Sequence, residues 1–196
     1  MKLVIEDNVL LKIENPDCED TAVIPDGVVT IGASAFYWEV MIKKIVIPDS
    51  VKKIERNAFA RSNIETIVIP DSVTELGIGV FSRCSKLRSA VIGKGVTVLP
   101  GSAFYKDQHL KWVELPDTLK EIQDDAFDGC YGLVTVRVNG KDYPIRANPA
   151  PLPVKLTFES LEKSKHEEME YLSQCTWMDE FEYIDYCITG GDYYSY

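Results

Sequence analysis

The stretch IVIPDSVKKIERNAF, residues 45–59, decides the fold, because the chain contains a close variant of it five times. In each copy a Pro, or a Gly in the fourth copy, is followed eleven residues later by a Phe. Successive Pro or Gly positions lie 23, 22, 23 and 23 residues apart. A fixed period of this length with apolar punctuation predicts a solenoid whose repeats stack on one another. The five Phe positions are Phe36, Phe59, Phe81, Phe104 and Phe127.

Each copy contains the local signals for one coil of such a solenoid. The Ile-Val-Ile segment is rich in β-branched side chains, which predicts a short strand with Ile45 and Ile47 facing inward. Pro48 cannot donate a hydrogen bond to a strand ladder, so it ends this strand, and Pro-Asp-Ser suits a tight turn. Residues 51–54 then return along the opposite wall, and Phe59 fills the corner of the coil. One coil has a single layer of core, so the coils must stack to bury it.

The consensus of the copies, L-x-x-I-x-I-P-D-x-V-x-x-I-x-x-x-A-F-x-x-C, resembles the BspA-type leucine-rich repeat over about residues 1–140. The resemblance implies an α/β or mainly β solenoid, a right-handed stack of about five coils of 22–23 residues with an N-terminal β-hairpin cap. It also implies protein–protein or surface-adhesion roles without catalysis. The fourth copy departs from the pattern, with Gly93-Lys94 in place of Pro-Asp. The position that many other leucine-rich repeats fill with Asn holds Ser50, Ser72, Gly95 and Thr118.

Composition divides the chain into four parts. Asp7-Asn8 is a plausible two-residue turn for an opening hairpin, and Asn139-Gly140 is one for a closing hairpin. Four Pro between residues 144 and 153 predict a stiff linker. Beyond it, apolar residues at helical spacing predict a helix over about 158–174, and the remainder suits either a second helix or a strand. The parts are an N-terminal hairpin cap (1–20), the repeat solenoid (21–143), the Pro-rich linker (144–155) and an acidic, aromatic C-terminal segment (156–196).

The net charge of −10 is unevenly distributed. Residues 151–196 carry ten acids and three Lys, a net of −7, which leaves −3 for the first 150 residues. This balance argues against nucleic acid or an anionic membrane as the main partner, because such binding needs a basic surface.

Targeting signals are sparse. No apolar run approaches the roughly 20 residues of a membrane span. The start, MKLVIEDNVLLKI, lacks the uninterrupted apolar core of a secretion signal. We therefore expect a cytoplasmic protein if Met1 is the native start, with an extracellular or cell-surface location as the alternative.

Four aspartates occupy equivalent turn positions, where two interpretations are open. Stacked coils could align them into a calcium-binding ladder of carboxylates. Asp also serves tight turns directly, and solvent then screens the repulsion between neighbouring coils. The second interpretation is the simpler one, so we predict no metal and no cofactor. The aspartates are Asp26, Asp49, Asp71 and Asp117.

Residues with catalytic or redox potential are few. Cys84 and Cys130 share one repeat position two coils apart, roughly 10 Å, which exceeds disulfide reach and predicts small buried thiols. His109 and His166 are the only histidines. The sequence contains no G-x-S-x-G nucleophile elbow and no glycine-rich phosphate loop. We therefore predict that the chain is not an enzyme.

One predicted surface is apolar. If Ile45 and Ile47 face inward, the residue between them faces outward, and the equivalent positions form a stripe of valines with Trp112 at its edge. An exposed apolar stripe is typical of a partner site. Cover by the C-terminal segment or by self-association is a second interpretation, and the strand propensity of Val alone is a third. The valines are Val23, Val46, Val68 and Val91.

The function predicted from the sequence is non-catalytic binding of another, unidentified protein through this stripe. A cell-surface adhesion or glycan-binding module is one alternative. An architectural module that self-associates or positions the C-terminal segment is the other.

Overall fold

The computed structural model describes residues 1–14, 20–123, 125–138 and 140–144. The helix predicted over 158–174 and the rest of the C-terminal segment lie outside these residues. The described chain forms a β-solenoid of about five turns of about 23 residues, as predicted. Within this described part, no helix is long and apolar enough to span a membrane.

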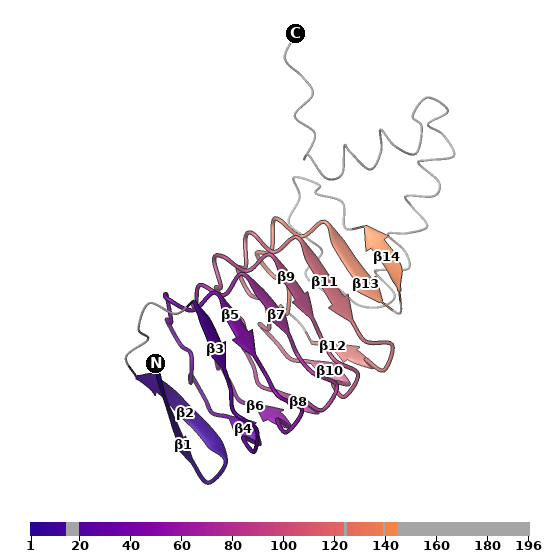
Figure 1. Ribbon diagram of the computed structural model, residues 1–196. Coiled ribbons are helices and arrows are strands. Elements are labelled where there is room, and N and C mark those ends of the chain that lie inside the picture. The colour runs from indigo at the N-terminus through magenta and orange to yellow at the C-terminus, as the bar shows by residue number, and fades with distance from the viewer. Residues whose placement is uncertain (15–19, 124, 139, 145–196) are drawn as a thin grey trace, which may run out of the picture.

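One wall of the solenoid is a parallel sheet that contains one strand from each of the five coils and a sixth from the closing hairpin (Figure 1). Its strands pair in register, so the sequence period becomes a stack of equivalent positions. One antiparallel strand, β14 (Lys141–Pro144), lies at the end of this sheet beside β13. The parallel strands, in spatial order, are β3 (Thr21–Val23), β5 (Lys44–Val46), β7 (Thr66–Val68), β9 (Ser89–Val91), β11 (Trp112–Leu115) and β13 (Thr135–Val138).

The opposite wall consists of strands of two residues each, with the apolar second residue turned toward the core. Three of them extend a sheet that begins with the N-terminal hairpin, and the last two form a separate parallel pair. The strands are β4 (Thr30–Ile31), β6 (Lys53–Ile54), β8 (Glu75–Leu76), β10 (Val98–Leu99) and β12 (Glu121–Ile122).

The strands of the parallel sheet begin one residue earlier than the Ile-Val-Ile segment predicts. β5 comprises Lys44–Val46, so Ile47 lies beyond the strand and is only half-buried. The strand ends there because Pro48 has no N–H group with which to extend the ladder. Ile45 is buried, so the inward direction on which packing depends is as predicted.

A hairpin covers the N-terminal end of the stack. β1 (Lys2–Glu6) and β2 (Val9–Glu14) are joined by Asp7 and Asn8, whose φ angles of 48° and 63° suit a two-residue type I′ turn. β2 then pairs with β4, and its buried Leu10 joins the core of the first coil. The predicted N-terminal cap is confirmed, and β13 with β14 forms the closing hairpin at the other end.

The core is organised around a column of Phe rings, one in each coil, in which Phe36 is tilted against Phe59 and the later neighbours are stacked. Neighbouring ring centroids lie 5.2, 5.5, 5.2 and 5.3 Å apart along the column. Aromatic rings attract at such distances, so the coils are joined through their corners as well as through their sheets. The predicted role of Phe as the filling of each corner is confirmed.

A column of hydroxyl groups occupies the place of the missing Asn ladder. Each hydroxyl donates a hydrogen bond to a backbone carbonyl of the preceding coil, which satisfies an acceptor at the turn. The fourth coil has Gly95 instead, because a Cβ atom there would lie 2.3 Å from the Val73 carbonyl oxygen. The bonds run from Ser50 to Val28 at 2.8 Å, from Ser72 to Val51 at 2.8 Å and from Thr118 to Lys94 at 2.6 Å.

Candidate binding surfaces

The four valines singled out from the sequence lie in one column of the parallel sheet. Val23 pairs with Val46, and Val68 pairs with Val91, in neighbouring strands. The exposed fractions are 58% for Val23, 42% for Val46 and 59% for Val68, whereas Val91 is half-buried. The exposed part of the column, which we call the Val ladder, is therefore Val23, Val46 and Val68 in three consecutive coils.

Trp112 lies on the same wall, but its ring is engaged within the molecule. The residue is half-buried, and the Arg137 guanidinium lies over its ring at 5.8 Å from the centroid. Arg137 also donates hydrogen bonds of 2.6 and 3.0 Å to the carboxylate of Asp142. The same hydrogen bond lowers the pKa of Asp142. Trp112 is therefore less available to a partner than the three exposed valines.

The turn aspartates remain exposed at their turns. The Oδ1 atom of Asp71 accepts a 2.8 Å hydrogen bond from the backbone amide of Lys94 in the next coil. This bond joins two neighbouring coils and satisfies the Lys94 amide. Within the described residues, no group of three or more His, Cys, Asp or Glu side chains could hold a metal ion. The four residues of this column are Asp26, Asp49, Asp71 and Asp117.

Cys84 and Cys130 are buried and not disulfide-bonded, and their burial is as predicted. Each thiol donates to a backbone carbonyl of the preceding coil, Cys84 to Phe59 at 3.1 Å and Cys130 to Phe104 at 2.9 Å. Burial raises the pKa of both thiols. Because the thiolate is the reactive form, these cysteines are core residues rather than reactive ones.

The coil between the two cysteines places an acid in the same column. Asp107 has no exposed surface, and its Oδ1 atom accepts a 2.7 Å hydrogen bond from the Cys84 amide. Its Oδ2 atom has no hydrogen-bond partner among the described residues. Loss of solvation raises the pKa of Asp107 well above its usual range. Sequence reasoning missed this residue, although its position three residues after Phe104 matches that of Cys84 after the preceding Phe.

A surface column that sequence reasoning also missed lies two residues after each Phe. Arg61, Arg83 and Lys106 are its members in the second, third and fourth coils, and we call them the basic ladder. All three are exposed, and their φ angles are 59°, 61° and 61°. The sequence contains a signal for this column, because a basic residue stands two positions after the Phe in three consecutive copies. The net charge of −10 conceals this local basic surface.

The repeat that generates these columns can be compared with known families. The family model of the BspA type leucine rich repeat region matches residues 17–134, in 6 copies. The match spans more than half of the chain. The chain belongs to the BspA-type leucine-rich repeat family. Such repeats are typically protein-interaction or surface modules, and they are generally non-catalytic.

Solved structures resemble this BspA-type repeat protein in fold. A leucine-rich repeat protein from Eubacterium ventriosum is 22% identical, with a TM-score of 0.62 over 66% of this chain. This chain spans only 36% of that protein. The T. pallidum leucine rich repeat protein is 23% identical, with a TM-score of 0.56, and the similarity covers 71% of this chain and 79% of that one. No curated protein matches significantly.

Proposed function

We propose that this BspA-type repeat protein is a non-catalytic module that binds another protein through the Val ladder. The observation that carries the proposal is the exposure of Val23, Val46 and Val68 side by side on an in-register parallel sheet. A row of exposed apolar side chains loses its unfavourable contact with water when a partner covers it.

The surroundings of the Val ladder also suit recognition. The neighbouring outward column contains Thr21, Lys44 and Thr66, which can form hydrogen bonds beside an apolar centre. An apolar centre with a polar rim is the usual composition of a protein interface. The valines are stiff at χ1 and sit on hydrogen-bonded strands, so little conformational freedom is lost on binding.

A double charge substitution tests this proposal. Val23→Glu combined with Val68→Glu changes the two most exposed members, and Val46 separates the two new carboxylates. We expect the variant to retain the wild-type thermal midpoint within about 4 °C, since surface changes have small effects. We also expect it to lose at least about tenfold in affinity for the protein that the wild type captures from lysate or culture fluid of its source organism. Biolayer interferometry with the purified captured protein measures that affinity.

The matched control places the same two charges on the opposite wall. Val29→Glu combined with Thr74→Glu again skips one coil, and both positions are exposed, Val29 by 41%. This control should bind the captured protein like the wild type. Equal affinity of the wild type, the control and the Val ladder variant would contradict the proposal.

A further inference from the structure

The basic ladder is a regular feature of the fold rather than a chance cluster. Its residues adopt a left-handed conformation that non-glycine residues seldom adopt, because the stacked coils require it at this corner. Hydrogen bonds between coils then hold the positions one above another at about 4.8 Å spacing. The backbone amide of each ladder residue donates to a backbone carbonyl in the next coil, one residue before the equivalent position. The bonds run from Arg61 to Ser82 at 2.9 Å, from Arg83 to Tyr105 at 2.8 Å and from Lys106 to Asp128 at 2.7 Å.

Aromatic rings lie beside these charges. Trp38 occupies the ladder position of the first coil and is 60% exposed, and the Arg61 guanidinium lies 5.4 Å from its ring centroid. The cationic groups of Arg83 and Lys106 lie 5.7 and 5.0 Å from the ring of Tyr105. A cation over an aromatic face is attracted by the ring quadrupole, which restrains the side chain. The ladder therefore presents its charges at restrained positions.

Acidic residues are sparse around the centre of this surface, although Asp128, beside Lys106 in the next coil, is exposed. The segment 76–106 contains five basic residues and no Asp or Glu, and the acid that follows it, Asp107, is buried. Among the described residues, no member of the basic ladder forms an ion pair. The ladder thus offers positive charge that the described part of the chain does not neutralise.

The C-terminal segment of the same chain has the complementary composition. Residues 151–196 carry a net charge of −7, and nine of the twenty aromatic residues fall within 156–196. Charge complementarity of this kind favours association of the two surfaces. The ladder and the segment are therefore matched in charge, and both contribute aromatic side chains.

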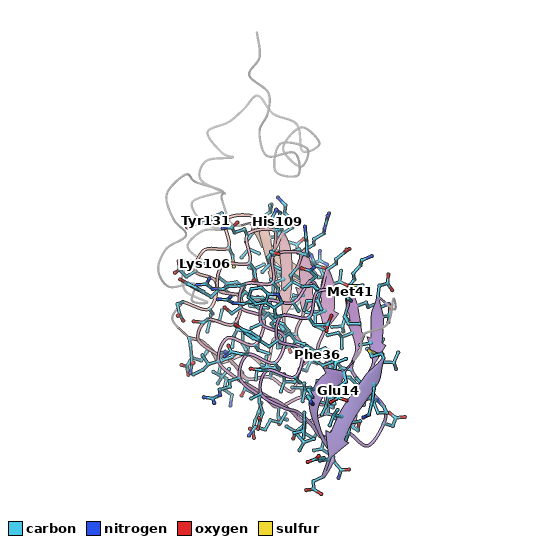
Figure 2. All side chains as sticks on the ribbon, turned by 90° about the vertical axis from the view of Figure 1, so that its left-hand side faces the viewer. Glu14, Phe36, Met41, Lys106, His109 and Tyr131 are labelled. Carbon is cyan, nitrogen blue, oxygen red and sulfur yellow. The ribbon has the colours of Figure 1, made fainter. Side chains whose placement is uncertain are left out.

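The chain also leaves the described solenoid on the side where the basic ladder lies. Pro144, the last described residue, pairs with Thr135 at the start of β13. The loops that bear the ladder enter the parallel sheet at this same edge (Figure 1). Figure 2 places Lys106 and Tyr131 toward the end of the solenoid opposite Glu14 in the N-terminal hairpin.

The length of the remaining chain is sufficient for contact. Arg61, the ladder residue farthest from the C-terminal end, is in the second coil. It therefore lies three coils, or about 14 Å along the stack, from the fifth and last coil. The six residues 145–150 could span about 20 Å when extended. A tethered segment also has an effective concentration in the millimolar range, which gives it an advantage over a separate acidic partner.

We propose that the basic ladder is the docking surface for the acidic C-terminal segment, residues 151–196, of the same chain. Carboxylates of the segment pair with Arg61, Arg83 and Lys106, and its aromatic side chains add contacts to the rings beside the ladder. The Val ladder lies on the sheet rather than on the preceding loops. The inference therefore does not depend on the proposed function.

Carbodiimide cross-linking of the full chain tests this docking, because the reagent activates a carboxylate, which then forms an amide bond with a nearby Lys amine and releases the reagent as a urea. We expect Lys106 to cross-link within the chain to acids of residues 159–192, with at least about fivefold higher yield than Lys52 on the opposite wall. The yield should fall at least about fivefold in 0.5 M NaCl, because salt screens exposed charges. Peptide mass spectrometry identifies the linked residues.

Charge reversal supplies the matched comparison. Arg61→Glu combined with Arg83→Glu should lower the Lys106 cross-link yield at least about fivefold. Lys52→Glu combined with Lys120→Glu makes the same change in net charge on the opposite wall and should leave that yield unchanged. The salt dependence of the wild type tests the inference even if the ladder variant fails to fold.

Three results would overturn the inference. Cross-links from Lys44, beside Val46, instead of Lys106 would place the segment over the Val ladder. Cross-links only between chains, detected with mixed isotope labels, would identify a second copy as the occupant. Absence of any cross-link to the segment would leave the ladder to an external acidic partner. Capture by the Val ladder variants is measured separately, so failure here is distinguishable from failure of the proposed function.

Discussion

Two buried columns run side by side through the solenoid and differ in how strictly their residues repeat. The first has Phe in all five coils, with neighbouring ring centroids 5.2 to 5.5 Å apart. The second lies three residues later and changes its chemistry from coil to coil. Its members from the second coil onward are Ser62, Cys84, Asp107 and Cys130, all of them buried.

The difference reflects what each column contacts. The Phe column packs against itself, so a ring in one coil requires a ring in the next. The second column contacts chiefly the backbone, because the thiols of Cys84 and Cys130 donate to carbonyl groups of the preceding coil. Its one hydrogen-bonding contact between side chains among the described residues is that of the Ser62 hydroxyl with the Cys84 sulfur, at 3.6 Å. Every coil supplies such carbonyls whatever its sequence. The type of side chain can therefore change from coil to coil where its contact is with the backbone. Asp107 is the least favourable member, because its buried Oδ2 atom has no partner among the described residues.

The largest expected effect comes from opening a gap in the Phe column. Phe81→Ala should lower the free energy of unfolding by about 3–5 kcal/mol, because it removes a fully buried ring and leaves a cavity. Phe36→Ala should cost about 0.5–1.5 kcal/mol less, because Phe36 is at the end of the column and contacts one ring instead of two. Urea unfolding of the two variants measures both values.

Equal costs for Phe36→Ala and Phe81→Ala would contradict the interpretation of the column as a stack. In that case each ring would stabilise the fold through burial within its own coil alone. A matched pair at the far end, Phe127→Ala against Phe104→Ala, gives an independent measurement of the same difference.

The next effect is a gain in stability from restoring the thiol column. Asp107→Cys should raise the free energy of unfolding at pH 7 by about 1–3 kcal/mol, because it removes a buried polar atom that lacks a described partner. The Cys84 amide would lose the Asp107 carboxylate but would keep the Phe81 carbonyl, from which it lies 3.2 Å. Thermal or urea unfolding under reducing conditions measures the change.

The pH dependence of stability tests the same residue. Burial raises the pKa of Asp107 in the folded chain. The stabilisation that protonated Asp107 gives the folded chain is therefore fully present below the unfolded pKa of about 3.9. It is lost as pH rises through the folded pKa. The advantage of Asp107→Cys over the wild type should grow above pH ~4. The control is Asp117→Asn, on an exposed turn, which should change stability by less than about 0.5 kcal/mol. If the advantage of Asp107→Cys were constant across pH, ionisation of buried Asp107 would not be the cause of the difference.

The contrast between the two columns also explains how much the sequence predicts. The coil and the N-terminal hairpin follow from local signals, the Pro-to-Phe spacing and the turn preference of Asp7-Asn8, so both could be predicted. The outward direction of the valines follows from strand alternation. Burial of Asp107, the left-handed backbone at Arg83 and the half-burial of Val91 arise only when coils stack. No local signal in one copy specifies them, and Asp is ordinarily a surface residue.

A smaller effect tests the hydroxyl column, whose contact is again the backbone. Ser72→Ala removes the 2.8 Å hydrogen bond to the Val51 carbonyl and should lower the free energy of unfolding by about 0.5–1.5 kcal/mol. Ser85→Ala, at an exposed position in the same coil, is the control and should be close to neutral. If the two variants were equally stable, the hydroxyl column would be a consequence of the fold and not one of its supports.

The smallest effect should come from the ion pair outside the core. Asp142→Asn removes the charge that holds Arg137 over Trp112, but both partners are partly exposed, so the thermal midpoint should fall by less than about 2 °C. Because the pairing lowers the pKa of Asp142, its contribution is present above the unfolded pKa and is lost as pH falls through the folded pKa. Amide exchange in β13 and β14 should accelerate in the variant, while the Phe column stays protected. Acceleration throughout the solenoid would instead show that the closing hairpin supports the whole stack.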